Sequence, residues 1–325
     1  PLGYFSGIGK ASKEGILVKG SDYLELLSQV NKIVFDKTGT ITTGISNDYK
    51  LEVLDDKYKE KDIINYYIKG EALSNHPLAK SVLNVFNKKV STKDVLNYKE
   101  TAGKGISYEI DGKKIKIGSS SFVNASDKDS YIYLKIDGKV VAKLKLIDDI
   151  KKDSISAILE LKKQNIKTFM FTGDKKKSAK EVAKKTGVDE VFYEMLPDDK
   201  YKKLDKIIKE NDKKTAFVGD GINDAPSLAL SDVGISMGIV GASSAIEASD
   251  IVIMNDSLSK IPEAIKISKF TKKIIKQNLI FAIGIKVLVL VLSAIGIANM
   301  WQAVFADTGV TLLTILNSTR ILRKK

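Results

Sequence analysis

The chain has 325 residues, which exceeds the usual size of one domain of about 100–150 residues, so two or more structural units are expected. It contains no cysteine, which excludes disulfides and thiolate metal sites within it. The formal net charge of +13 could suit a nucleic-acid-binding protein, but the lysines are scattered and no aromatic residues interleave with them. We therefore expect a solvated, lysine-rich surface and no nucleic-acid partner.

Residues 1–20 are apolar at first and then charged, as at the end of a membrane helix that continues into a stalk. The chain begins at Pro1 with no signal segment, and we expect it to be part of a longer protein. The apolar run Ile33 to Phe35 then ends at Asp36, in the sequence Asp-Lys-Thr-Gly-Thr. This pattern predicts a strand that delivers a carboxylate to its own carboxyl end, where open α/β sheets bind ligands. Asp36 is therefore a candidate nucleophile for an aspartyl-phosphate.

Residues 43–146 read as an inserted α+β domain. Residues 62–69 and 78–87 have apolar residues at helical spacing, while 108–118 and 131–146 alternate around Asp-Gly turns, as β-hairpins do. The insert holds the only histidine, His76, and a pair of glycines at Gly103 and Gly105. Each of these signals is weak alone, and the sequence has no Gly-x4-Gly-Lys-Ser/Thr loop, which disfavours a P-loop nucleotide site.

Strands and helices alternate from residue 147 to about 265, which predicts a parallel, doubly wound sheet. Two more apolar runs end in polar turns, the first in Thr172-Gly173-Asp174 and the second in the segment from Gly219 to Asp224. We expect these two strand ends to meet the end that carries Asp36.

Two apolar segments close the chain, 279–298 and 300–322, and each is about long enough to cross a bilayer. They contain Lys286 and Asp307, and a charge at the centre of a bilayer costs about 2.5–3.5 kcal/mol, so the two should be paired or functional. A buried helical hairpin of a soluble protein is the alternative. The Asp307-Thr-Gly triplet also occurs in aspartic proteases, but that site needs a loop between strands, and this triplet lies in a segment of helical length. Basic residues flank the outer ends of both segments, which predicts cytoplasmic ends; they are Lys266, Lys269, Lys272, Lys273, Lys276, Arg320, Arg323, Lys324 and Lys325.

The motifs DKTGT, TGD and GDGINDAP, in this order, resemble the phosphorylation domain of P-type ATPases in the haloacid-dehalogenase superfamily. The resemblance implies an α/β fold: a haloacid-dehalogenase-like doubly wound parallel sheet with an inserted α+β nucleotide-binding domain and a C-terminal transmembrane helical hairpin. The domains implied are the end of a membrane helix and stalk (1–20), the phosphorylation domain in two parts (21–42 and 147–265), the nucleotide-binding domain (43–146) and two transmembrane helices (266–325).

By this resemblance Asp36 takes the γ-phosphoryl group of ATP, and Mg²⁺ is bound by Asp36, the Thr38 carbonyl and Asp220, with Asp224 beside them. The further phosphate-site residues implied are Lys37, Thr172, Gly173, Asp174, Lys200 and Asn223. In the heavy-metal branch of the family a Ser-x-His-Pro segment and a Gly-x-Gly segment line the ATP pocket. The nucleotide-binding residues implied are Glu71, His76, Gly103 and Gly105.

The last two segments resemble those of zinc- and cadmium-exporting P-type ATPases, which have a lysine in one span and Asp-x-Gly in the next. By that resemblance Asp307 is a ligand of the exported ion and Lys286 its counter-charge. The implied function is ATP-driven export of Zn, Cd or Pb across the cell membrane by a multi-pass protein with cytoplasmic catalytic domains. The upstream Cys-Pro-Cys helices and the actuator domain are not in this sequence. Lys175 also replaces the usual Asn after Thr-Gly-Asp.

Two rival interpretations stay open. A soluble haloacid-dehalogenase-type phosphatase would share the sheet and the nucleophile, but hydrolytic relatives place an acid/base Asp two residues after the nucleophile, where this chain has Thr38. A nucleic-acid-binding module would show salt-sensitive binding.

Overall fold

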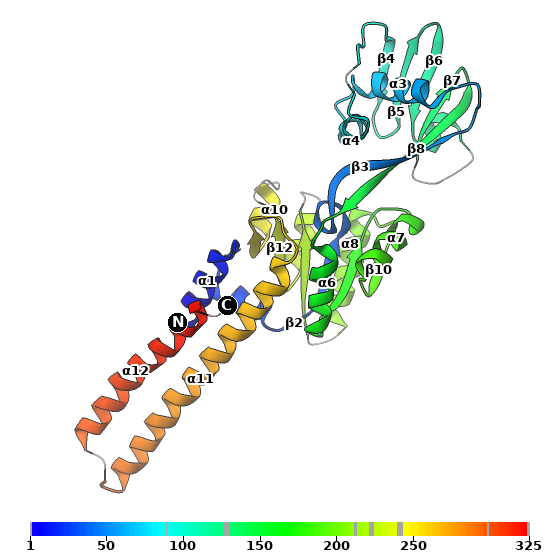
Figure 1. Ribbon diagram of the computed structural model, residues 1–325. Coiled ribbons are helices and arrows are strands. Elements are labelled where there is room, and N and C mark those ends of the chain that lie inside the picture. Colours follow the sequence, from blue (N-terminus) through cyan, green and yellow to red (C-terminus); the bar gives the residue numbers. More distant parts are fainter. Residues whose placement is uncertain are drawn as a thin grey trace. The chain divides into compact units, whose positions relative to one another are not determined.

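The computed structural model describes residues 2–88, 90–125, 131–210, 213–220, 224–238, 243–297 and 299–323. The chain forms two compact units (Figure 1). The first comprises Pro1–Ile41, Lys152–Gly173 and Ala179–Lys325, and the second comprises Thr42–Lys151 with Asp174–Ser178. The insert expected over 43–146 lies within the second unit.

The first unit is built on a seven-stranded sheet of order β1-β13-β12-β11-β2-β9-β10. All neighbouring strands are parallel except β1, which runs antiparallel to β13 at one edge. The strands are β1 Ile16–Val18, β2 Val30–Asp36, β9 Lys167–Phe171, β10 Glu190–Phe192, β11 Lys214–Gly219, β12 Val233–Met237 and β13 Ile251–Ile253. The predicted parallel sheet is confirmed, and β1 is an addition, because its segment was expected to be a stalk.

Strand β2 is central to this sheet and is buried on both faces. Ile33 and Phe35 belong to one apolar core, while Val34 packs in a second core with Leu204 and Phe217. Burial on both faces explains why the strand reads as a continuous apolar run rather than an alternating one. The helices associated with the sheet are α2 Ser21–Leu27, α6 Ser154–Lys163, α7 Lys176–Thr186, α8 Pro197–Lys209, α9 Ala225–Leu230 and α10 Ser243–Ala248.

The second unit has a six-stranded antiparallel sheet of order β3-β8-β7-β6-β5-β4. Its elements are β3 Thr42–Val53, α3 Glu60–Glu71, α4 Pro77–Phe86, β4 Leu96–Thr101, β5 Gly105–Ile110, β6 Lys113–Gly118, α5 Ser120–Val123, β7 Ile132–Ile136 and β8 Lys139–Ile150. Both Asp-Gly turns are tight hairpin turns with two positive φ angles, 49° and 73° at Asp111-Gly112 and 45° and 87° at Asp137-Gly138. The predicted hairpins are confirmed, whereas β3 and β4 were not predicted.

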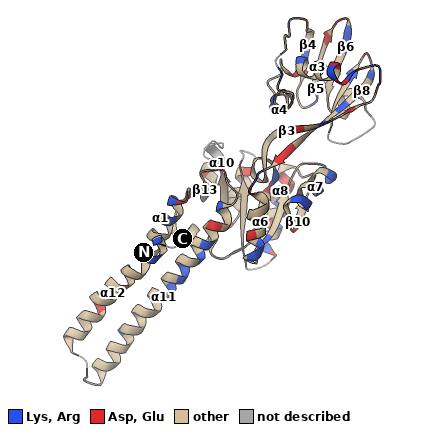
Figure 2. Cartoon of the chain, viewed as in Figure 1, with Lys and Arg blue, Asp and Glu red and all other residues tan. Residues whose placement is uncertain are grey.

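The C-terminal part of the first unit is a pair of helices, α11 Lys260–Ala294 and α12 Met300–Arg323, joined by a short connection (Figure 1). Helix α1 Leu2–Lys13 packs against both, and a Cβ at Gly7 would lie 2.6 Å from Thr271 Oγ1, so this glycine permits close contact with α11. Helix α11 begins well before the segment expected at 279, and its basic residues gather near the sheet (Figure 2). Among the described helices, α11 alone is long and apolar enough to cross a membrane, so a crossing by both helices stays a prediction.

Candidate active site

The carboxyl ends of three parallel strands meet around Asp36, the last residue of β2. Strand β2 lies between β9 and β11, with Asp36 opposite Phe171 and Phe35 opposite Val218. This register brings the residues that follow β9, Thr172 and Gly173, and those that end and follow β11, Gly219 and Asp220, to the same edge of the sheet. The predicted convergence of strand ends is therefore present for these segments.

The turn after β2 wraps the nucleophile candidate closely. The Thr38 backbone N–H donates to Asp36 Oδ2 at 3.0 Å. Gly39 has a φ of +73°, and a Cβ there would lie only 1.4 Å from Asp220 Oδ2. Glycine is thus required at position 39 both for its backbone conformation and for the approach of the Asp220 carboxylate.

Three carboxylates and one ammonium group form the centre of the site. Oxygens of Asp36, Asp220 and Asp224 all lie within 4.8 Å of one another. Lys200, in the first turn of α8, hydrogen-bonds to Asp36 Oδ1 and also to Asp224 Oδ1 at 3.3 Å. With every group ionised, the four side chains carry a net charge of about −2, and an all-oxygen set of this charge suits a hard divalent cation.

Burial and the neighbouring charges shift the pKa values of Asp224 and Lys200. Burial, followed by the charge of Asp36, raises the pKa of Asp224 to about 6. Burial alone would lower the pKa of Lys200, but the adjacent Asp36 and Asp224 carboxylates outweigh it and raise that pKa above the ordinary value. Lys200 is therefore a permanent positive charge beside the candidate nucleophile.

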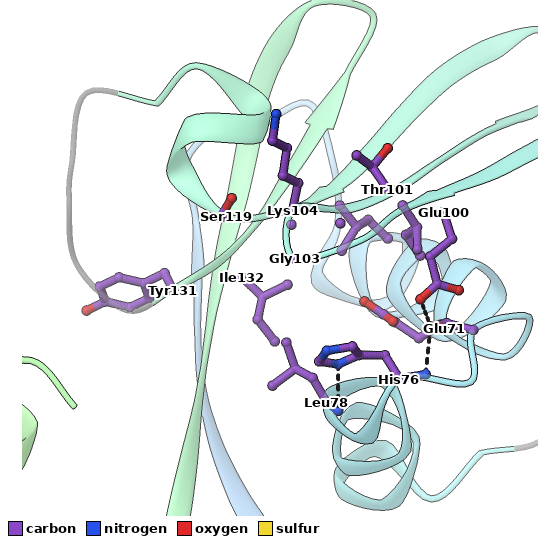
Figure 3. A pocket seen from close by; sticks show the side chains of 15 residues that line it. Glu71, His76, Leu78, Glu100, Thr101, Gly103, Lys104, Ser119, Tyr131 and Ile132 are labelled. Carbon is purple, nitrogen blue, oxygen red and sulfur yellow. Dashed lines mark hydrogen bonds between the residues drawn. The ribbon is translucent and has the colours of Figure 1, made fainter. Parts of the chain in front are cut away.

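A pocket of about 340 Å³ lies in the second unit, and Figure 3 shows the side chains that line it. Its lining includes Glu71, His76, Gly103 and Gly105. His76 is the N-cap of α4, where its Nδ1 accepts a hydrogen bond from the Leu78 backbone N–H at 3.1 Å. This bond fixes the imidazole ring and leaves Nε2 for a ligand.

Backbone and buried acid complete this pocket. Gly105 has a φ of +149°, and a Cβ there would lie 2.1 Å from the Ile117 carbonyl oxygen, so only glycine allows the two strands to approach here. Glu71 is buried, and this burial, together with the charge of Glu100, raises its pKa to about 7. Glu100 itself accepts a hydrogen bond from Ser74 Oγ at 3.1 Å. The pocket therefore offers bare backbone, a neutral or weakly acidic carboxyl group and an imidazole.

A third polar group lies in the helical hairpin. Lys286 Nζ of α11 and Asp307 Oδ1 of α12 are 2.9 Å apart. Their side chains are 60% and 73% exposed in this chain. The ion pair expected from the sequence is thus formed on the surface of the hairpin.

Comparison with known proteins identifies the family. A sequence model of the haloacid dehalogenase-like hydrolases matches residues 30–232, which is more than half of the chain. The chain belongs to this family. The match begins at the first residue of β2 and so includes the strands whose ends carry Asp36, Gly173 and Asp220.

Several transport proteins match this haloacid dehalogenase-like chain from end to end. A cadmium, zinc and cobalt-transporting ATPase of Bacillus subtilis is 41% identical over 100% of this chain and 48% of that protein. A zinc-transporting ATPase of Synechocystis is 40% identical over 99% of this chain and 46% of that protein. The chain thus spans about half the length of the curated relatives it matches.

Solved structures agree. The crystal structure of a zinc-transporting PIB-type ATPase in an E2·Pi state superposes with a TM-score of 0.82 and 29% identity, over 99% of this chain and 55% of that one. The catalytic domain of a CPx-ATPase gives a TM-score of 0.68 and 29% identity, over 80% of this chain and 98% of that one. The predicted resemblance to heavy-metal P-type ATPases is confirmed.

Most of the predicted phosphate-site residues lie at the edge of the sheet that carries Asp36, and two of them, Asp174 and Asn223, are not located there by the structure. Lys37 and Thr172 are buried at the edge of the sheet that carries Asp36, whereas Thr38 is exposed. Asp174 is grouped with the second unit, so its place beside Asp36 stays a prediction. Asn223 lies outside the described residues.

Sequence reasoning missed part of the pocket in the second unit. Glu100 and Thr101 of β4 also line it, as do Ser119, just before α5, and Tyr131, just before β7. None follows a recognisable motif, so only the folded chain brings them together. Lys104 could have been found, because it stands between the two glycines that were singled out.

Proposed function

We propose that this chain is the catalytic part of a longer pump that exports a divalent heavy metal ion, zinc, cadmium or lead, with ATP as energy source. The observation that carries the proposal is the cluster of Asp36, Lys200, Asp220 and Asp224 at the ends of parallel strands. Similarity to cadmium- and zinc-transporting ATPases, which extends over this whole chain and about half of theirs, supports the choice of reaction.

In this proposal an Asp36 carboxylate oxygen attacks the γ-phosphorus of ATP. The new oxygen–phosphorus bond forms as the bond to the β,γ-bridging oxygen breaks, and ADP leaves with that electron pair. Lys200 offsets the charge of the transferred group, and the Thr38 N–H fixes the orientation of the nucleophile. Positioning and electrostatic stabilisation are the main sources of rate in phosphoryl transfer. The pocket with Glu71, His76, Gly103 and Gly105 would bind the nucleotide.

The carboxylate cluster fits Mg²⁺, the ion that phosphoryl transfer ordinarily needs. The acidic groups gathered there supply carboxylate oxygens, and the excess of two negative charges is that of a divalent cation site. Asp36, Asp220 and the Thr38 carbonyl would hold the ion, with Asp224 beside them. When bound, the ion supplies positive charge that offsets the charge of the phosphates.

Thr38 separates this proposal from a phosphatase. A threonine hydroxyl two residues after the nucleophile is a poor acid/base group for the activation of water. The phosphoenzyme should therefore persist until another part of the longer protein acts on it, and the expected partners are an actuator domain and further membrane helices. Steady phosphate release by this chain alone would instead favour the soluble phosphatase.

Transport is the second half of the proposal. The hairpin carries a lysine and an aspartate inside an apolar surface, and α11 has the length and composition of a membrane span. Asp307 would bind the exported ion and Lys286 would replace it as counter-charge. The pump would be a multi-pass protein of the cell membrane with its catalytic units in the cytoplasm.

The test is phosphorylation of the chain by ATP labelled at the γ-phosphate. We expect an acid-stable, hydroxylamine-sensitive label on the wild type and none on Asp36→Asn. Asp198→Asn is the matched control, because Asp198 is an exposed acid on α8 and should label normally. Equal labelling of Asp36→Asn and the wild type would refute the proposal.

A further inference from the structure

We propose that Lys32 is a positioning residue for Lys200: it holds helix α8 in register along strand β2, so that Lys200 Nζ reaches Asp36. Its catalytic consequence rests on the phosphoryl transfer proposed above, whereas the register itself does not. Lys32 lies outside every motif described so far.

Lys32 is a buried lysine, with 6% of its surface exposed. Its Nζ donates to the backbone carbonyl of Ile207 at 2.6 Å, in a bond that is itself buried. Ile207 is in the last turn of α8, where carbonyl groups lack an intrahelical partner and carry the negative end of the helix dipole. An ammonium group placed there stabilises that end of the helix and ties it to β2.

Three residues on one face of β2 contact α8 at three levels. Side chains alternate along a strand, so Lys32, Val34 and Asp36 share one face. Val34 belongs to the same apolar core as Leu204 and Ile207, while Asp36 binds Lys200. The helix therefore runs antiparallel to the strand, with Lys32 at its last turn and Asp36 at its first.

The lengths of the two elements agree with this arrangement. Seven residues of helix separate Lys200 from Ile207, which is about 10 Å at 1.5 Å per residue. Four residues of strand separate Lys32 from Asp36, which is about 13 Å at 3.3 Å per residue. Both tethers use a lysine side chain, whose length covers the difference.

The two polar contacts, Lys32 with Ile207 and Lys200 with Asp36, are directional, whereas the apolar contact between them is not. Packing of Val34 against Leu204 and Ile207 is not directional, so it permits small slides and rotations of α8. A misplacement of about 1 Å in a reacting group can lower a rate by about 100-fold. Loss of the Lys32 tether should therefore act on the position of Lys200 rather than on nucleotide binding.

The first experiment compares rates of phosphoenzyme formation by the full chain. We expect Lys32→Met to lower the rate by about 10- to 100-fold with the KM for ATP unchanged. Lys32→Arg, which keeps a charged donor, should recover most of the rate. Lys206→Met is the matched control, because this lysine is an exposed residue near the same end of α8. A Lys32→Met rate equal to that of the control would overturn the proposal.

A double-mutant cycle tests whether Lys32 acts through Lys200. If it does, Lys32→Met should add little to the defect of Lys200→Met. Additive effects of the two substitutions would mean that Lys32 acts through general stability, and the proposal would be lost. If Lys32→Met does not fold, Lys32→Gln, a neutral donor, takes its place in the same cycle.

A readout without catalysis separates this proposal from the proposed function. The rate at which Lys200 is acetylated by an amine-reactive ester, followed by mass spectrometry, should rise in Lys32→Met and not in Lys206→Met. Unchanged reactivity of Lys200 would contradict the register. If the wild type forms no phosphoenzyme while Lys32→Met still raises the reactivity of Lys200, the proposed function is refuted and the register is kept.

Discussion

The proposed phosphoryl site, formed by Asp36, Lys200, Asp220 and Asp224, contains a lysine paired with an aspartate, and so does the helical hairpin, in opposite surroundings. Lys200 and Asp36 have side chains that are 15% and 9% exposed, and Lys200 also bonds to Asp224. Lys286 and Asp307 form a one-to-one pair at 2.9 Å, with side chains that are 60% and 73% exposed. A lysine–aspartate pair is thus mostly buried in one region and mostly exposed in the other.

The difference in charge balance predicts different tasks. In the phosphoryl site three carboxylates face one lysine, so acid is in excess and a divalent cation is attracted while the lysine stays charged. In the hairpin one lysine faces one aspartate, so the pair is neutral as a unit. We infer that the first arrangement is built to stay closed around its ligands, and the second to open when an ion arrives.

Substitution of Lys200 should break the enclosed pair with the largest effect. Lys200→Met removes a fixed charge that stabilises the transferred group, and loss of one such group costs about 100- to 1,000-fold in rate. Phosphoenzyme formation from labelled ATP in rapid-quench experiments measures it. Lys202→Met, an exposed lysine on the same helix, should leave the rate within about twofold. A normal rate for Lys200→Met would mean that the enclosed pair has no catalytic role.

Substitution of the open pair should act on metal dependence instead. In membranes that contain the whole pump, Asp307→Ala should abolish the stimulation of phosphorylation by Zn²⁺ or Cd²⁺. Lys286→Met keeps the ligand and removes the counter-charge, so stimulation should persist while release of the ion slows. Metal titrations of phosphoenzyme level and of its decay measure both effects. Stimulation that survives in Asp307→Ala would assign the ion site elsewhere.

The sequence predicted some parts of the sheet and of the site and not others. Asp36 and Asp220 could be placed together because each comes at or just after the end of a strand that finishes in an apolar run, and parallel strands end at one edge of a sheet. Strand β1 could not be predicted, because its three residues lie between charged and glycine-containing segments and pair only with β13. Strand β4 has mostly exposed residues and no alternation, so pairing with β5 alone defines it.

The contacts of Lys200 could not be predicted from the sequence pattern either. Its contact with Asp224 depends on where α8 lies against the sheet, and no local pattern encodes that position. The Lys32 tether and the pocket residues Glu100 and Tyr131 were missed for this reason. Short-range pattern gives the strands and their polar ends, whereas helix placement is a property of the packed core.

Glu71 sharpens the comparison, because it is a buried acid that forms no ion pair with a lysine in the part of the chain that the structure describes. Burial and Glu100 raise its pKa to about 7 from an ordinary value of 4.5, so the folded chain favours its neutral form. This contribution to stability is complete below pH 4.5 and is lost as the pH rises through 7. The loss is about 1.4 kcal/mol for each pH unit in that interval.

Glu71→Gln tests this sign by calorimetry of the full chain in detergent. The glutamine variant cannot ionise, so it should gain stability relative to the wild type as the pH rises from 5 to 8. Glu109→Gln is the control, since Glu109 lies on β5 of the same unit and is only partly buried. A constant difference between Glu71→Gln and the wild type across this range would mean that Glu71 is not held neutral.

The smallest effect is expected at a polar network that fixes the hairpin independently of its ion pair. Asn278 of α11 donates to the Thr314 carbonyl at 3.1 Å and to Ser318 Oγ at 2.9 Å, and its Oδ1 accepts from Asn317 Nδ2 at 2.7 Å. Asn278 and Lys286 each contact a side chain of α12, so both lie on the part of α11 that meets α12.

Because the network holds the register of the helices, the Lys286–Asp307 pair can open without loss of the hairpin. Each interhelical hydrogen bond in a membrane contributes about 0.6 kcal/mol, so Asn278→Leu should lower unfolding stability in detergent by roughly 1–2 kcal/mol. Gln277→Leu, at the exposed neighbouring position, should change it little. The combined Lys286→Met and Asp307→Asn variant should cost less than Asn278→Leu. If it costs more, the open pair is a structural clamp, and the contrast with the enclosed pair fails.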